Sequence, residues 1–177
     1  KNIRIPNGNY KISSPLVIPQ GIKVYGDGYL TQLHPTFTNN NILFCDESNQ
    51  APYDISNIWI NADGTNKNNN LTGIKLGSSR NSIFYNIIIT GTWDKAIKIY
   101  PEDTNGNDVD NPTFSKIFTD RTGGLLIKAN SNISRGHITD CRFIDCILAT
   151  NNEPTFTDLY TTPIDIEGAS NKYIFGI

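Results

Sequence analysis

The strongest constraint on the fold is a repeat of short strand-like segments, which fall into two interleaved families. Members of the first family share an apolar core beside a turn and recur at similar intervals: Gly73-Ile74-Lys75-Leu76, Ala96-Ile97-Lys98-Ile99, Gly124-Leu125-Leu126-Ile127 and Cys146-Ile147-Leu148-Ala149. Members of the second recur at nearly equal intervals: Asn57-Ile58-Trp59-Ile60, Asn86-Ile87-Ile88-Ile89, Ser115-Lys116-Ile117-Phe118 and Cys141-Arg142-Phe143-Ile144. Two families that advance together predict a solenoid, in which each coil adds a strand to several parallel sheets.

Composition agrees with many short strands. The 177 residues include 26 Ile, 23 Asn and 17 Thr, which combines β-branched strand formers with a residue that tolerates left-handed turns. A hairpin meander would not repeat a two-strand unit across connections of unequal length, whereas a solenoid lets long connections such as Asn61 to Asn70 and Pro101 to Pro112 loop outward. We therefore expect an all-β chain: one right-handed, single-stranded parallel β-helix over 1–177, with opening coils in 1–50 and repeating coils in 51–177.

Charge and hydropathy exclude several classes of protein. Fifteen Lys and Arg against 17 Asp and Glu, with a sequence pI of about 5.6, argue against nucleic-acid binding. No apolar run is long enough for a membrane span, so we expect no membrane insertion. Cys45, Cys141 and Cys146 have neither a second cysteine nor a histidine cluster at metal-ligand spacing, which predicts buried thiols. The absence of Met predicts a processed or partial piece of a longer polypeptide.

The N-terminal segment carries a resemblance to a known family. Residues Pro6 to Ile12 read P-x-G-x-Y-x-I, Leu16 to Pro19 read L-x-I-P, and Gly26 to Gly28 read G-x-G. In this order and spacing they resemble the opening coil of the pectate-lyase-like superfamily, and the repeated segments extend the resemblance over nearly the whole chain. Within that superfamily the opening is similar to the β-helical tailspikes and depolymerases of bacteriophages, and to secreted bacterial polysaccharide lyases and hydrolases.

Strand alternation predicts which side chains point inward. We expect aliphatic stacks made of Ile58, Ile87, Ile74, Ile97, Ile147 and Ile166. We expect one outward column of Lys75, Lys98, Leu126, Leu148 and Asp165, and a neighbouring column of Tyr100, Lys128, Thr150 and Glu167. Trp59 and Ile88 form a further outward pair, and an apolar ridge of this kind is typical of an interface between subunits.

Asp165 and Glu167 are the candidate catalytic residues. Two residues apart on one strand, they face the same side with Cα atoms about 6.5 to 7 Å apart. Inverting glycosidases hold their carboxyl groups at roughly 6.5 to 9.5 Å, which leaves room for a water. A solvated strand face would show the same spacing. The second half of the chain carries twelve acidic and eight basic side chains, which favours acid/base chemistry there.

A second acidic cluster follows the Ala96 segment and gives the runner-up pair, Glu102 and Asp103. With Asp108 and Asp110 it forms an oxygen-rich loop that resembles a calcium site, although it lacks the helix-flanked spacing and the closing Glu of an EF-hand. A polar, solvated loop explains the same residues.

Aromatic and basic side chains supply candidates for substrate binding, because sugar rings stack on flat amphipathic groups. These candidates are Trp93 in the turn Gly91 to Asp94, and Lys98, Tyr100 and Lys128 in the outward columns. His34 and His137 have no nucleophile nearby in sequence and are interpreted as structural.

Three functions remain open. The first is a tailspike-type depolymerase, by hydrolysis or elimination, of a bacterial surface polysaccharide, located on a virion tail or outside the cell. The second is a glycan-binding or structural β-helical module without catalysis. The third is a secreted pectate-lyase-like enzyme, which needs calcium and a base; Arg121 beside Asp120 is a candidate base. Because the open ends of an isolated β-helix expose unpaired strand edges, we also expect a homotrimer.

Overall fold

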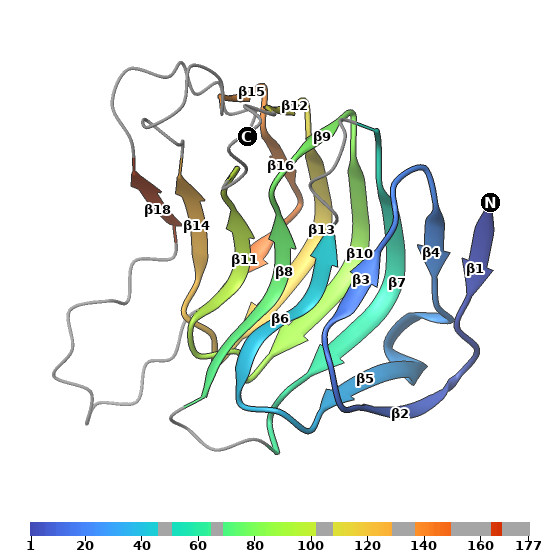
Figure 1. The fold of residues 1–177 in the computed structure, drawn as a ribbon. Coiled ribbons are helices and arrows are strands. Elements are labelled where there is room, and N and C mark those ends of the chain that lie inside the picture. Colours follow the sequence, from blue (N-terminus) through green and yellow to red (C-terminus); the bar gives the residue numbers. More distant parts are fainter. Residues whose placement is uncertain (46–50, 65–68, 102–107, 129–136, 150–163, 168–177) are drawn as a thin grey trace, which may run out of the picture.

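The computed structural model describes residues 1–45, 51–64, 69–101, 108–128, 137–149 and the backbone of 164–167. These residues form a parallel β-solenoid, which confirms the fold predicted from the repeat (Figure 1). Strands that lie side by side come from successive coils, and each pairing between them is parallel.

The strands form three sheets, which we name A, B and C. Sheet A has nine strands: β1 (Asn2–Arg4), β2 (Gly8–Ile12), β4 (Lys23–Tyr25), β5 (Thr31–Pro35), β7 (Asp54–Asn61), β10 (Ile83–Thr90), β13 (Thr113–Asp120), β16 (Arg142–Ile144) and β17 (Ile147–Leu148). Sheet B has six: β3 (Leu16–Ile18), β6 (Asn39–Cys45), β8 (Asn70–Leu76), β11 (Lys95–Ile99), β14 (Leu125–Lys128) and β18 (Ile164–Glu167). Sheet C has three: β9 (Ser79–Arg80), β12 (Val109–Asp110) and β15 (Ile138–Thr139). A short 3-10 helix, η1 (Gly28–Leu30), separates β4 from β5.

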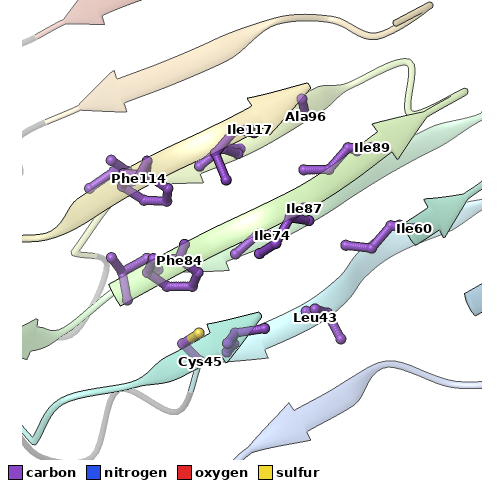
Figure 2. Packing of buried hydrophobic residues seen from close by; sticks show 14 of the residues in the cluster. Leu43, Cys45, Ile60, Ile74, Phe84, Ile87, Ile89, Ala96, Phe114 and Ile117 are labelled. Atoms are coloured by element: carbon purple, nitrogen blue, oxygen red, sulfur yellow. The ribbon is translucent and has the colours of Figure 1, made fainter. Parts of the chain in front are cut away.

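The core is a set of inward columns between the sheets (Figure 2). Ile58 pairs with Ile87 in sheet A and Ile74 with Ile97 in sheet B, and all four are buried, as the alternation predicts. Aromatic rings form one column: Phe114 stacks on Phe84 at 4.6 Å and on Phe143 at 5.0 Å between ring centroids.

Parts of the predicted register are wrong. Ile147 is 62% exposed, because the Cys146 segment belongs to sheet A, where β17 pairs with β13, and not to sheet B. The sheet B neighbour of β14 is β18, which pairs Leu126 with Asp165, so Leu148 drops out of the predicted outward column. In sheet A, Ile87 pairs with Ile117, one position later than the segment alignment implies.

Residues with left-handed backbone explain these shifts. Asn57, Asn86, Lys116 and Asp145 have φ of 57°, 53°, 52° and 53°, and they occupy equivalent positions in successive coils. The strand bends at these residues, and the alternation of inward and outward side chains starts again after the bend. In the last coil the bend separates β16 from β17, which both pair with β13. A second such column, Asn81, Asn111 and Asp140, lies beside sheet C. Asn57, Asn86, Asn81 and Asn111 therefore occupy corners that repeat from coil to coil.

The connections follow the prediction in part. The N-terminal motif forms β2, β3 and the turn at Gly26 to Gly28, and Asn61 to Asn70 connects β7 to β8. The range Pro101 to Pro112 is not purely a loop, because it contains β12. Among the described residues, no helix is long and apolar enough to cross a membrane.

Candidate functional site

The outer face of sheet B holds most of the predicted site residues. The register forms one column from Phe44, Lys75, Lys98, Leu126 and Asp165. Lys75 and Leu126 lie in the predicted outward column, but they are only 6% and 7% exposed. The Lys75 ammonium lies 5.2 Å from the centre of the Phe44 ring, a cation-π contact that favours burial of the charge.

Lys98, in the middle of this column, is held by a small polar network. The carboxylate of Asp94 accepts a hydrogen bond from the Thr72 hydroxyl at 2.7 Å and pairs with the Lys98 ammonium at 3.5 Å. The Lys98 side chain is 25% exposed, so the ammonium still reaches the surface.

Trp93 lies next to this network in the turn that connects β10 to β11. Its backbone N–H donates to Oδ1 of Asn69, and Nδ2 of Asn69 donates to the carbonyl of Gly91. Asn69 is buried and also accepts from the Leu71 N–H. It therefore fixes the turn that presents the half-exposed indole. The sequence pattern did not single out Asn69, because it lies in a run of Asn residues.

Tyr100 and Lys128 meet in the neighbouring column, as predicted. The Lys128 ammonium lies 5.6 Å from the centre of the Tyr100 ring. The next strand places Glu167 in register with Lys128, and Asp165 in register with Leu126. The backbone of β18 thus brings the proposed catalytic pair to the same sheet as Lys98, Tyr100 and Lys128. The role of the pair stays a prediction.

The runner-up cluster is only partly within the described residues. Glu102, Asp103 and Thr150 lie outside them. The carboxylate of Asp108 accepts from the His137 N–H at 2.9 Å, and that of Asp110 accepts from Thr139 and pairs with Arg80. Within the described ranges, no group of three or more His, Cys, Asp or Glu side chains could hold a metal ion. Asp108 and Asp110 thus have protein donors as partners.

Arg121 is a poor candidate for the base of a lyase. Its guanidinium donates to Asp63 at 2.8 Å and to Asp120 at 3.0 Å. A guanidinium has donors only and remains protonated in proteins, so this group ties two turns together instead of accepting a proton.

Comparison with known proteins supports the fold. No protein-family model matches the chain, and no curated protein matches it. Among solved structures, the chain is similar to "Geobacillus virus E2 - ORF18", with a TM-score of 0.59, 19% identity, and coverage of 88% of this chain and 35% of that one. It is also similar to "iota-carrageenase complexed to iota-carrageenan fragments", with a TM-score of 0.60, 18% identity, and coverage of 84% and 41%.

The chain is a β-solenoid similar in fold to a phage protein and to a polysaccharidase. At these identities the likeness shows the fold alone. The chain spans less than half of either matched structure.

Proposed function

We propose that this chain is the β-helical part of a bacteriophage tailspike-type depolymerase, which binds and cleaves a bacterial surface polysaccharide. The observation that carries the proposal is the outer face of sheet B, where the Lys98 and Lys128 ammonium groups and the Tyr100 ring gather and the backbone of β18 lies in register with β14. Both structural neighbours favour it, one as a phage protein and one as a carrageenase with carrageenan fragments bound. The site of action is then a virion tail or the space outside the cell.

Substrate binding falls to four side chains on or beside this face. Trp93 and Tyr100 offer flat rings on which sugar C–H groups stack, and Lys98 and Lys128 offer ammonium groups for hydroxyl or acidic substituents. Asn69 and Asp94 act as positioning residues, since one fixes the Trp93 turn and the other holds Lys98.

Cleavage falls to Asp165 and Glu167. For a hydrolase, one carboxyl group is protonated and gives its proton to the leaving oxygen, while the other activates a water. For a lyase, one carboxylate removes the ring proton next to an acidic group, a C=C bond forms as the C–O bond to the leaving sugar breaks, and the other carboxyl group gives its proton to the leaving oxygen. Both reactions place the scissile bond above β18, next to Lys128.

The test combines a reducing-end assay with charge-removing variants of the intact protein on capsular polysaccharide and lipopolysaccharide. Asp165→Asn and Glu167→Gln preserve shape, and each should lower cleavage about a hundredfold or more while glycan binding remains. Asp145→Asn is the matched control, because Asp145 is exposed on sheet A and Asn tolerates its left-handed backbone. Wild-type turnover in both site variants would contradict the assignment of this pair.

A glycan-binding module without catalysis is the second candidate, and one observation favours it. The described carboxylate beside this face, Asp94, already has Thr72 and Lys98 as partners, so it is not free to act as acid or base. Binding without new reducing ends, in wild type and variants alike, would establish this alternative. In either role we propose a homotrimer, supported by the apolar outer face of sheet A.

A further inference from the structure

A polar pocket lies away from the sheet B site, on the outer surface where sheet A turns toward sheet B. It has a volume of about 550 Å³, within the usual range for small-ligand sites. Strands β2 and β5, the end of β7 and the turns after β5 and β7 form its wall: Asn9, Lys11, His34, Pro35, Thr36, Thr38, Asn61 and Gly64. None of these belongs to the proposed catalytic face.

Neighbouring groups fix two polar side chains in the wall of the pocket, Asn61 and Thr36. Nδ2 of Asn61 donates to Gln32 at 3.1 Å, and Oδ1 of Asn61 accepts from the Asp63 N–H at 3.2 Å. The Thr36 hydroxyl donates to the carbonyl of Ile12 at 3.2 Å. Groups held in this way lose little freedom when a ligand binds.

The pocket also carries positive charge that the described residues do not neutralise. Lys11 and His34 are adjacent in the β2–β5 register, and no carboxylate is among the described residues that line the pocket. Several other cations in the described part have acidic partners, such as Arg4 with Asp27 and Lys23 with Asp54. Among the ion pairs of that part, none includes Lys11. In a chain of net charge −2, this is a local excess of positive charge.

We propose that this pocket binds an acidic saccharide unit, with its carboxylate or sulfate group against the Lys11 ammonium. His34 donates from a ring nitrogen, and Asn9 and Thr38 bond the sugar hydroxyl groups. This proposal rests on the proposed function, because it takes a polysaccharide as the ligand. It adds that the polysaccharide is anionic. The pocket acts as a binding subsite separate from the bond that is cleaved.

Lys11 and His34 have a signal in the sequence. The interval from Lys11 to His34 equals the interval from Gly73 to Ala96, the first two members of their family of segments. Side chains at that interval face the same way in successive coils, and the apolar residues on both sides of Lys11 and of His34 mark these two as the outward pair.

The test is calorimetric titration of the intact protein with glucuronate-, galacturonate- and mannuronate-containing tetrasaccharides, each beside its neutral methyl ester. A sulfated dextran tetrasaccharide beside plain dextran distinguishes sulfate from carboxylate. We expect at least one acidic ligand to bind about tenfold or more tightly than its neutral form, and Lys11→Gln to remove that difference. His34 imidazole NMR signals should shift in wild type on saturation.

Arg142→Gln is the matched control, because it removes one exposed cation from β16 and leaves the pocket intact. An equal loss in Arg142→Gln, no preference for any acidic ligand, or binding of inorganic sulfate as tight as that of the saccharides would each overturn the proposal. The two proposals can fail separately. If the protein cleaves the polysaccharide and Lys11→Gln binds the acidic ligand as wild type does, the depolymerase stands and the subsite is wrong. If the protein binds acidic ligands more tightly than neutral ones but cleaves none, the subsite stands and the protein is a binding module.

Discussion

At the residue scale, a column of left-handed residues runs through the middle of sheet A. L-residues pay roughly 1 to 2 kcal/mol in this conformation, and Asn tolerates it better than most because its short side chain bonds locally. Nδ2 of Asn86 donates to Oδ1 of Asn57 at 2.7 Å, which links two successive coils.

This column makes a prediction about Asn86. Replacing Asn86 with Ala removes the hydrogen bond to Asn57 and a residue type that tolerates left-handed backbone. It should lower the free energy of unfolding by about 1 to 2 kcal/mol. Asn86→Gly removes the bond alone and should cost less than Asn86→Ala, because Gly adopts positive φ freely. Urea denaturation measures both; an Ala variant as stable as the Gly variant would contradict the account.

The thiols give a second prediction at this scale. Burial raises the pKa of Cys141 to about 12 and raises the pKa of Cys45 further, while Cys146 is only half-buried. We expect a thiol reagent at mildly alkaline pH to label Cys146 first in the native protein, and all three cysteines only in denaturant. Mass spectrometry of the labelled protein locates the sites, and rapid native labelling of Cys45 would contradict its burial.

The raised pKa of Cys141 also predicts how stability responds to alkali. The unfolded thiol loses its proton near its ordinary value of 9.0, whereas the folded thiol keeps it up to about 12. The folded state therefore binds more protons in this interval, and its contribution is complete below pH 9.0 and lost as the pH rises toward 12. Cys141→Ala should show a shallower alkaline decline in urea midpoint than wild type; parallel declines would contradict the linkage.

At the scale of elements, the column of stacked rings joins three strands of sheet A. Phe84 and Phe114 are fully buried, and their planes differ by 9° (Figure 2). Phe114→Ala empties the middle of the stack and should cost about 3 to 5 kcal/mol of unfolding free energy. Tyr29→Ala is the control, since Tyr29 is 65% exposed on η1 and should change stability by about 0.5 kcal/mol or less. Equal losses in both variants would contradict a stacked core.

The sequence interval between strands predicts the parallel sheets, but it does not predict every pair of neighbouring strands. Ile58, Ile87, Ile74 and Ile97 could be placed from sequence because their paired strands recur at a regular interval without a break. Ile147 could not, because Asp145 bends the last strand of sheet A and makes one strand look like two segments. The Phe column was not predicted for a related reason. Lys116 has left-handed backbone, which sets the register of β13, but Lys is not a residue typical of that conformation, so the sequence does not mark the corner.

The candidate site follows the same logic. Alternation placed Lys98, Tyr100 and Lys128 on the outer face of sheet B, since they lie on unbroken strands or directly beside them. It could not supply Asp94 and Asn69, which act from turns, nor the burial of Lys75. A strand pattern gives the side of the sheet on which a residue lies, whereas turn contacts depend on the coils above and below.

At the scale of the whole molecule, the outer faces of sheets A and B differ in chemistry. Sheet B presents Lys98, Tyr100 and Lys128, whereas sheet A presents an apolar column in which Trp59 pairs with Ile88 and the register continues to Phe118 and Ile147. The exposed apolar side chains beside it also belong to sheet A: Ile83, Tyr85 and Ile144. An exposed apolar column of this kind is typical of an interface between subunits, and it lies on a different sheet from the proposed glycan-binding residues.

This division of faces predicts which substitutions disrupt the proposed homotrimer. Phe118 is 41% exposed in the middle of the sheet A column, so Phe118→Asp places a charge where subunits would meet and should convert trimer to monomer. Light scattering after size exclusion measures the mass, and far-UV circular dichroism checks that the β-solenoid persists. Val17→Asp is the matched control, because Val17 is 55% exposed on β3 of sheet B and should leave the trimer intact. A monomeric wild-type protein, or a trimer that survives Phe118→Asp, would show that the apolar face of sheet A does not join copies of this chain.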